Sequence, residues 1–317
     1  MLEENKIDVS VIIPTFNRLW CLPKAIDSSR NTQCKTEIIV VDDGSTDGTW
    51  EWLQAQTGII SIRQENQGQP YAINKGASFA TGKYIRFLDS DDFLCEGTID
   101  KQYTKAIETN AELVCSRVDS YNMETGEITI NPEISHWEDF LEIQLGNQYG
   151  SHFLGMLFHR KLVDAVPRRP DFALREDRMF LLEVGLLSPN MAIVEGCAGY
   201  WVQHAQQMQA NYQGLKSQVT NWQYVNIYKK ILSKLEKTNQ LTEIRKNAAC
   251  TALWPVTTWI AQHHLKDAAQ VYQWILKLNP SFQIPEKGLK GFLYSFLGFS
   301  FTQKILAIGR FVKYGWK

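Results

Sequence analysis

Three features that mark particular classes of protein are missing from this 317-residue sequence. The 33 Lys and Arg residues do not outnumber the 34 Asp and Glu residues, so the basic excess of a general nucleic-acid-binding protein is absent. No run of about 18 uncharged apolar residues occurs, so a helix that spans a membrane is not expected. The N-terminal segment is polar and acidic, and we therefore expect no signal peptide.

Cysteine is also sparse, and its spacing argues against two kinds of site. The six cysteines lie far apart, without a C-x-x-C pair, which favours reduced, buried thiols in a cytoplasmic protein over a disulfide framework or a zinc site. The 44% of hydrophobic and 21% of charged residues are typical of a folded globular chain and not of a disordered one. The cysteines are Cys21, Cys34, Cys95, Cys115, Cys197 and Cys250.

The first part of the chain alternates between strand and helix patterns. Short apolar runs rich in β-branched residues predict buried strands, and segments with apolar residues at helical spacing predict the helices between them. This order gives βαβ units and a mostly parallel sheet, so the predicted fold class is α/β, and ligands should bind beyond the carboxyl ends of the strands. The predicted strands are 9–13, 37–41, 59–64 and 84–88, and the predicted helices are 19–30, 46–56 (capped by Thr46 or Asp47) and 70–79.

The pattern changes after about residue 113. Two short runs, 112–120 and 127–131, flank Thr125-Gly126, which predicts a β-hairpin. Residues 136–200 mix helices with short strands that would close one edge of the sheet. The rest of the chain is predicted to be helical, with helices near 215–236, 240–264 and 266–278, the last of which ends at Asn279-Pro280.

Acidic residues follow two of the predicted strands. Asp89-Ser90-Asp91-Asp92 comes directly after the strand 84–88, and Asp42-Asp43 follows the strand 37–41. Carboxylates this close repel one another unless a cation compensates them, and such hard oxygen ligands suit Mg²⁺ or Mn²⁺. The alternative for the first group is a solvated acidic turn in which one aspartate caps the next helix. The second acidic strand end favours the metal site.

Several motifs follow one another in a fixed order along the chain. They are residues 11–18 (VIIPTFNR), 40–47 (VVDDGSTD), 66–68 (NQG), 72–76 (AINKG) and 80–92 (ATGKYIRFLDSDD), followed by Glu176-Asp177 and His204. In this order they resemble the family-2 glycosyltransferases, which have the GT-A fold. The resemblance is dense before residue 100 and persists, more weakly, to about residue 210. It implies a Rossmann-like sheet with flanking helices and a nucleotide-sugar substrate.

The resemblance implies a nucleotide site at the strand ends. The loop from Pro14 to Arg18 would hold the nucleoside, with Phe16 against the base or ribose, and Asp43 would accept a hydrogen bond from a uracil ring. The alternative for Asp42 and Asp43 is that they only form the turn before Gly44. Asp89 would contact the ribose or the metal. The residues assigned to the nucleotide are Pro14, Thr15, Phe16, Asn17, Arg18, Asp42, Asp43, Gln67, Asp89 and Ser90.

The resemblance also implies a metal ligand and a base. Asp91 would be the principal ligand of Mn²⁺ or Mg²⁺ in a D-x-D motif with Asp89, and His204 would lie near the metal or diphosphate unless it is structural. Asp177, with Glu176 as the second candidate, would take the proton from the acceptor hydroxyl in an inverting transfer. The alternative for Glu176-Asp177 is the common enrichment of acids at a helix N-terminus.

One position departs from the family pattern. The family commonly has an arginine where this sequence has Ile73. If that arginine supports the acidic residues, either Arg86 or Lys75 takes its place or the site is looser.

The C-terminal segment 287–317 has a different character. It contains six Lys and Arg residues, no Asp or Glu, and many aromatic and aliphatic residues. This pattern is typical of an amphipathic helix that lies at a membrane interface. The alternative is a terminal helix that packs on the protein's own core.

These features predict an inverting, metal-dependent glycosyltransferase that moves a sugar from a nucleotide-diphosphate donor, in particular a UDP-sugar, to a hydroxyl of a saccharide, lipid-linked or small-molecule acceptor. A sugar nucleotidyltransferase would need a glycine-rich basic loop that residues 14–18 lack; a non-catalytic nucleotide-sugar-binding module is the other alternative.

Residues 136–175 should select the acceptor. We expect a location in the cytoplasm, in part at the cytoplasmic membrane face. The expected domains are 1–212, 213–286 and 287–317.

Overall fold

The computed structural model describes residues 6–135, 137–147, 150, 152–207 and 215–314, and the chain forms two compact units. The first unit consists of residues 1–141 and 149–207, and the second of residues 142–148 and 208–317. The predicted domain boundary at 212 and the predicted start of the acceptor region at His136 lie outside the described residues.

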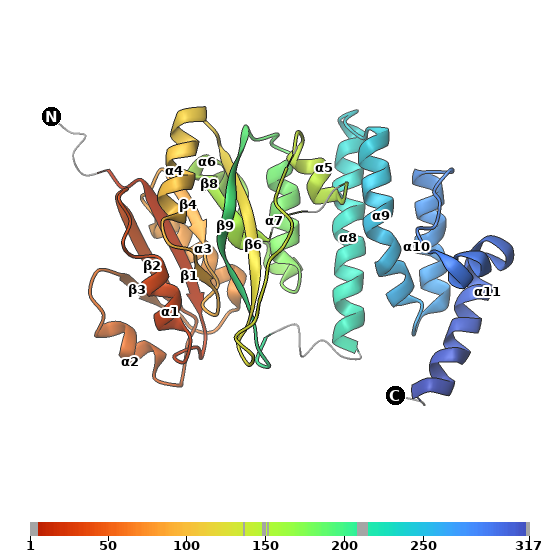
Figure 1. Cartoon of the computed structure of the whole chain (residues 1–317), viewed down its shortest axis with the longest axis horizontal. Helices are drawn as coiled ribbons and strands as arrows, with labels where there is room; N and C mark the ends of the chain where they lie inside the picture. Colours follow the sequence, from red (N-terminus) through yellow and green to blue (C-terminus); the bar gives the residue numbers. More distant parts are fainter. Residues whose placement is uncertain (1–5, 136, 148–149, 151, 208–214, 315–317) are drawn as a thin grey trace. The chain divides into compact units, whose positions relative to one another are not determined.

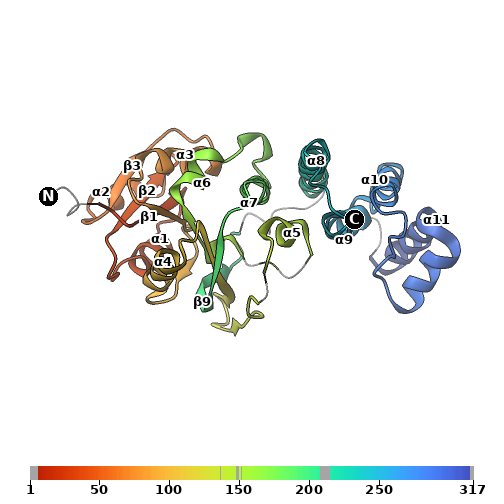
Figure 2. The ribbon, with the colours of Figure 1, turned by 90° about the horizontal axis from the view of Figure 1, so that it is seen from above.

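The first unit is built around one mixed sheet with helices on both faces (Figures 1 and 2). The strand order is β3-β2-β1-β4-β8-β6-β9-β5, with β7 paired to β6. The first four strands in this order are parallel, which confirms the predicted βαβ units. The strands are β1 Val9–Thr15, β2 Thr36–Asp42, β3 Ile60–Arg63, β4 Tyr84–Phe87, β5 Phe93–Leu94, β6 Leu113–Asn122, β7 Ile128–Thr129, β8 Met156–His159 and β9 Met191–Gln203.

The edge beyond β4 is closed by the second half of this unit. β8 runs antiparallel to both β4 and β6, and β9 runs parallel to β6. The predicted hairpin is confirmed, because β6 and β7 pair antiparallel around Gly126, which has a φ of 72°. Short strands from distant parts of the chain thus extend the parallel sheet.

The three helices predicted before residue 80 are confirmed, but the helix Thr98–Thr109 was not predicted and one cap differs. Helix α2 begins after its N-cap residue Gly48, which has a φ of 90°. Asp47 lies just before the cap and accepts hydrogen bonds from the amide and hydroxyl of Thr49. The prediction that Thr46 or Asp47 is the N-cap is therefore wrong by one residue. The helices are α1 Leu22–Ser28, α2 Thr49–Gln54, α3 Gln69–Phe79, α4 Thr98–Thr109, α5 Phe140–Leu145, α6 Arg160–Ala165 and α7 Glu176–Gly185.

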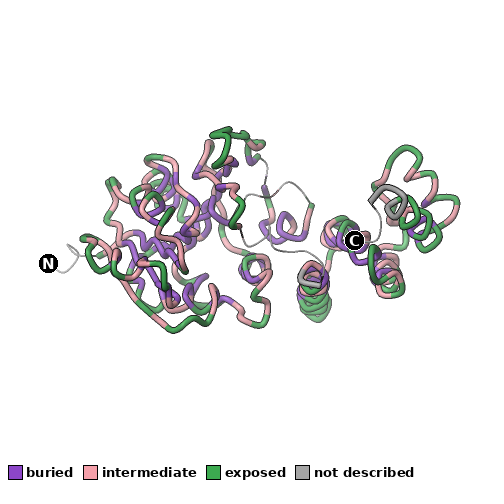
Figure 3. Tube along the Cα trace, turned by 90° about the horizontal axis from the view of Figure 1, so that it is seen from below, coloured by how far each residue is buried: buried purple, intermediate pink, exposed green. Residues whose placement is uncertain are grey.

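Both faces of β1 are buried, as its unbroken apolar run requires. Val11 and Ile13 belong to a core with Leu22 and Ile99 from the helices. Ile12 lies on the other face, beneath α3 at Gly76. The strands of the first unit are accordingly largely purple in the burial view (Figure 3).

The second unit is helical, and its three predicted helices are confirmed. Thr242 caps α9 by accepting a hydrogen bond from the amide of Arg245, and Tyr228 donates to the carbonyl of Leu145. Within the described residues, one helix is long and apolar enough to cross a membrane by length and composition. The sequence analysis did not predict this helix, because it searched only for runs of uncharged apolar residues. The helices are α8 Leu215–Lys237, α9 Glu243–Ile260, α10 Leu265–Leu278 and α11 Gly288–Tyr314.

The close packing of α3 on the sheet gives a test of the fold. A Cβ atom at Gly76 would lie 2.6 Å from Cγ2 of Ile12 and 3.2 Å from Cγ2 of Val41. We expect Gly76→Ala to lower the free energy of unfolding by about 1–3 kcal/mol, the usual effect of overpacking, as measured by urea denaturation. Ser78→Ala, at an exposed position of the same helix, should change it by less than about 0.5 kcal/mol. Equal stability of the two variants would contradict the packing.

Candidate active site

Three strand ends meet at one edge of the sheet. β1 lies between β2 and β4, and Thr15 pairs in register with Asp42. The segments that leave these strands therefore lie side by side: the loop from Phe16, the turn at Asp43 and the acidic residues from Asp89. Sequence reasoning predicted this gathering from the parallel sheet.

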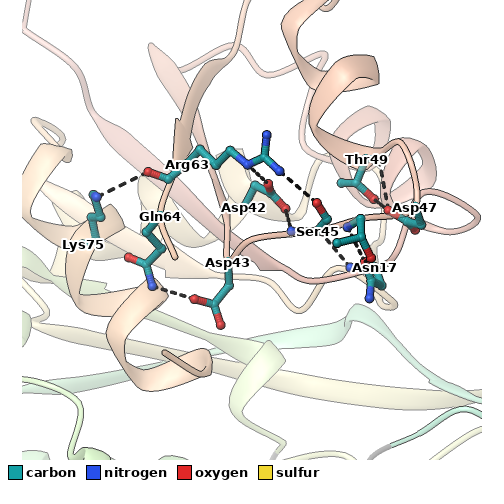
Figure 4. Close-up of polar contacts among 10 residues, drawn as sticks. Asn17, Asp42, Asp43, Ser45, Asp47, Thr49, Arg63, Gln64 and Lys75 are labelled. Atoms are coloured by element: carbon teal, nitrogen blue, oxygen red, sulfur yellow. Dashed lines mark hydrogen bonds and ion pairs between the residues drawn. The ribbon is translucent and has the colours of Figure 1, made fainter. Parts of the chain in front are cut away.

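The first two loops are tied together by Asn17 (Figure 4). Its amide donates to Oγ of Ser45 at 2.8 Å, and its Oδ1 accepts from the amide of Thr46 at 2.8 Å. Asn17 has a φ of 53°, in the left-handed region that asparagine tolerates better than most residues. Nearby, the amide of Asp43 donates to the carbonyl of Thr15 at 2.8 Å. Asn17 thus fixes the loop, which leaves the ring of Phe16 43% exposed.

The two aspartates after β2 differ in their surroundings. Asp42 is completely buried, accepts from the amide of Ser45 and lies 3.3 Å from Nε of Arg63, so its carboxylate is occupied by the turn. Asp43 accepts from Nε2 of Gln64 at 2.7 Å and from the amides of Gln67 and Gly68 at 3.0 and 2.8 Å. These bonds hold the β3–α3 loop, and a carboxylate with about four acceptor positions retains one for a ligand.

The acidic cluster, defined as Asp89, Asp91 and Asp92, is only partly compensated. Oδ1 of Asp89 accepts from Nε2 of Gln69 at 2.9 Å, and Oδ1 of Asp92 accepts from the amide of Val202 at 2.8 Å. Burial and the neighbouring Asp91 raise the pKa of Asp89 to about 7, and burial with Asp89 raises the pKa of Asp92. The protein alone therefore disfavours the charged forms, which a cation would favour.

Asp91 is brought together with His204 from the end of β9. Oδ2 of Asp91 lies 3.0 Å from Nε2 of His204 and 3.5 Å from Arg18. Nδ1 of His204 accepts from the amide of Gln206, so a neutral ring carries its proton on Nε2 and donates to Asp91. The His204 ring also packs edge-on against Trp20, with centroids 5.0 Å apart. His204 thus lies beside the aspartate that was expected to be the principal metal ligand.

The donor set fits a divalent cation that is completed by its substrate. Over the described part of the chain, no group of three or more His, Cys, Asp or Glu residues is arranged to hold a metal ion. Mg²⁺ and Mn²⁺, however, are commonly held by one or two carboxylates together with substrate phosphates. Asp91, with Asp89 or His204, supplies such a partial set.

Glu176 and Asp177, at the start of α7, have opposite environments. Glu176 is buried and lies 2.7 Å from the guanidinium of Arg168, whereas Asp177 is exposed. Burial raises the pKa of Glu176, and Arg168 opposes that effect. Both carboxylates also contribute to the raised pKa of Asp89, which places them near the acidic cluster. Of the two, Asp177 is open to a substrate.

Arg168 was missed by sequence reasoning. Its guanidinium lies 4.6, 4.2 and 4.1 Å from the ring centres of three phenylalanines, the phenylalanine cage of Phe87, Phe153 and Phe180. Asn74 holds the Arg168 backbone by bonds of 2.8 and 3.0 Å to its amide and carbonyl. Asn74 and Arg168 are 94 residues apart in the sequence, so no local motif pointed to Arg168.

The two residues that were expected to replace the family arginine serve other contacts. Arg86 is buried and donates to the carbonyl of Leu154 and to the side chain of Gln102, and burial lowers its pKa to about 10. Lys75 lies 3.5 Å from the carbonyl of Arg63. Arg168 instead lowers the pKa of Asp89, so it adds a positive charge near the cluster besides that of Arg18.

The fold and this site define a GT-A-like domain, and comparison with known proteins assigns its family. Residues 10–165 match the family model described as Glycosyl transferase family 2. Glycosyltransferase GlyA of Streptococcus pneumoniae is 35% identical over 131 residues, which are 40% of this chain and 18% of that protein. An uncharacterized glycosyltransferase of Haemophilus influenzae is 29% identical over 55% of this chain and 70% of its own length. Residues 10–165 thus match glycosyl transferase family 2, and the other relatives named here are glycosyltransferases as well.

Solved structures confirm the fold. S. aureus TarS 1–349 in complex with UDP-GlcNAc has a TM-score of 0.64 at 13% identity, covering 97% of this chain and 92% of that one. The mannosyltransferase PcManGT of Pyrobaculum calidifontis, in complex with GDP-Man and Mn²⁺, has a TM-score of 0.51 at 14% identity, covering 96% and 88%. The chain spans only 18% and 41% of the lengths of GlyA and of GlyG from S. pneumoniae.

The buried ion pair gives a test of the site's framework. Arg168→Met leaves Glu176 as an unpaired buried carboxylate, so we expect a loss of about 3 kcal/mol in the free energy of unfolding, measured by urea denaturation at neutral pH. The double variant Arg168→Met with Glu176→Gln should recover part of this loss. Arg169→Met, at a partly exposed pair with Asp171, should cost less than about 1 kcal/mol. A double variant as unstable as the two single losses added together would contradict this account.

Proposed function

We propose that the chain transfers a sugar from a nucleoside-diphosphate sugar, in particular a UDP-sugar, to a hydroxyl group, with inversion at the anomeric carbon. The observation that carries the proposal is that three strand ends meet at one edge of the sheet in a domain that matches family 2. There Asp91 lies beside His204, and Asp177 is exposed. Relatives named glycosyltransferases, and solved neighbours with UDP-GlcNAc or GDP-Man, support it. The family favours a transferase over a sugar nucleotidyltransferase.

The loop from Pro14 to Arg18 is proposed to hold the nucleoside. The exposed ring of Phe16 offers a flat apolar surface to the base or ribose, and the remaining acceptor position of Asp43 suits the N–H of a uracil ring. Gln67 lies beside this carboxylate, because its backbone amide donates a hydrogen bond to Asp43. Asn17 and Asp42 are proposed to act by shaping the loops.

The cation is proposed to be Mn²⁺ or Mg²⁺. Asp91, with Asp89 and His204, would hold it, and when bound it would neutralise charge that grows on the leaving diphosphate. The partial protein donor set and the raised pKa of Asp89 support this assignment. Arg18, 3.5 Å from Asp91, is placed to contact the same phosphates.

Asp177 is proposed as the general base. An inverting transfer needs a carboxylate that accepts the proton of the acceptor hydroxyl as its oxygen attacks the anomeric carbon. Asp177 is exposed near the acidic cluster, whereas Glu176 is held by Arg168. Glu176 is therefore proposed to orient the start of α7, and its pairing favours Asp177 over Glu176, the second candidate, as the base.

The acceptor is proposed to enter through a cavity of about 320 Å³ beside this base. Its wall includes the rings of His152 and Trp201, stacked 5.8 Å apart, together with Arg117 and Asn131. Burial lowers the pKa of His152, and Asp177 and Asp91 oppose this, so the cavity lies near the carboxylates. An aromatic wall with a few polar groups suits a saccharide, and His152 falls within the region expected to select the acceptor.

The protein is proposed to work in the cytoplasm, with residues 287–317 in contact with the cytoplasmic face of a membrane. A non-catalytic nucleotide-sugar-binding module is the alternative. The presence of an exposed Asp177 favours the enzyme, because a binding module has no use for a base at that position.

The metal assignment predicts the behaviour of one variant. Asp91→Ala removes the proposed principal ligand, so Mn²⁺-dependent binding of UDP should be lost by isothermal titration calorimetry while the thermal unfolding temperature without ligand stays close to wild type. Asp27→Ala, an exposed aspartate of α1, should bind UDP with Mn²⁺ as the wild type does. Unchanged metal-dependent affinity in the folded Asp91→Ala protein would refute the assignment.

The base assignment predicts a loss of turnover without a loss of binding. Asp177→Asn keeps the shape of the side chain but cannot accept the proton, so UDP release from the active UDP-sugar should fall by a factor of about 10² or more at unchanged donor affinity. Asp171→Asn, an exposed aspartate before the same helix, serves as the control. Near-normal turnover by Asp177→Asn would move the base elsewhere.

A further inference from the structure

Helix α11 is two helices that meet at a break. Gly298 has φ 72° and ψ 175°, which no helix adopts, between the segments 288–297 and 299–314. The stretch Gly288–Gly309 is long and apolar enough to cross a membrane only if it is continuous. Each segment alone is shorter than the roughly 20 helical residues that a bilayer requires. The break therefore favours a position along a membrane surface over a position across it.

One side of α11 is fixed to the helical unit. The ring of Tyr294 packs edge-on against Trp254 with centroids 5.2 Å apart, and Phe299 stacks on Tyr272 at 4.7 Å. Across the break, Nε2 of Gln303 donates to Oη of Tyr294 at 2.8 Å. The segment is therefore held as a folded part of the protein, as the packing alternative for this segment expected.

The remaining apolar side chains of α11 are exposed. Leu289, Phe292 and Phe296 are 76%, 62% and 76% exposed, and their spacing of three and four residues puts them on one helix face. The rings of Phe292 and Phe296 lie parallel, with centroids 5.9 Å apart. In the second segment Phe301, Ile305 and Ile308 repeat this spacing at 55%, 36% and 64% exposure. In Figure 3 much of the tube at the right end of the view, which belongs to α11, is green.

Basic residues predominate around these faces. Residues 287–317 contain no Asp or Glu, and Lys287, Lys290 and Lys304 lie among the exposed apolar positions. Lys290 is compensated by Glu286 at 2.8 Å, which lies just before the helix. Three further basic residues follow in the sequence, Arg310, Lys313 and Lys317.

We propose that α11 is an interfacial binding site for anionic phospholipid, in which the face of Leu289, Phe292 and Phe296 enters the headgroup region while the protein-facing side stays docked on α9 and α10. Exposed large apolar side chains combined with uncompensated basic residues match a surface that is both apolar and negatively charged. The break limits how deeply α11 can enter the membrane, because neither segment is long enough to span the bilayer. This site is independent of the proposed transfer reaction.

The test is co-sedimentation of the full chain with vesicles of phosphatidylcholine mixed with phosphatidylglycerol, and with vesicles of pure phosphatidylcholine. The wild type should bind the mixed vesicles, and high salt should weaken this binding because it screens the basic residues. Phe292→Ser with Phe296→Ser should lower the partition coefficient at least about tenfold, since each loses the burial of a large apolar side chain. Ile130→Ser, at a residue that is 69% exposed in the other unit, is the matched control and should bind as the wild type does.

Two measurements keep the test decisive. Circular dichroism and the thermal unfolding temperature should be unchanged in the double variant, because the substituted rings are exposed. Analytical ultracentrifugation distinguishes a second copy of the chain as the occupant: a wild-type dimer that ignores vesicles and becomes a monomer in the double variant would overturn the proposal. Equal vesicle binding by the wild type and the double variant would also overturn it.

Discussion

The crowding of carboxylates at one edge of the sheet is the constraint on which the rest of this site depends. Asp42 is balanced by Arg63, Glu176 by Arg168, and Asp91 by His204 and Arg18. Asp89 and Asp92 keep a raised pKa because no comparable partner offsets their burial. The uncompensated charge is thus concentrated where we propose a divalent cation and the diphosphate of the donor.

The same constraint explains the division of work between neighbouring acids. Asp42 and Glu176 are buried with arginines and stabilise the turn and the start of α7, whereas Asp43 and Asp177, one residue later in each case, face the β3–α3 loop and solvent. A buried pair is costly to break, so each pair fixes the position of the acid that follows it. The phenylalanine cage around Arg168 reinforces this arrangement, since a guanidinium is attracted to the faces of aromatic rings.

The helical unit carries a different kind of information. Aromatic contacts of Tyr294 and Phe299 fix α11 on its own unit, yet the faces at Phe292 and Phe301 remain exposed. The two alternatives drawn from the sequence, core packing and membrane contact, therefore describe opposite sides of one helix. A glycine with a positive φ makes both compatible, because it ends the first segment before it is long enough to span a bilayer.

The sequence by itself determined the parallel sheet, the gathering of Asp43, Asp89 and Asp91 at its edge, and the helical character of the second half. Periodicity and the polarity of strand ends are local properties, and parallel strands must end at the same edge. Only the tertiary structure decided that Asp42 and Glu176 are paired with arginines while Asp177 is exposed, and that Arg168, not Arg86 or Lys75, lies near the cluster. Burial and pairing depend on residues far apart in the chain, such as Asn74 and Arg168, whose contact leaves no periodic trace in the sequence.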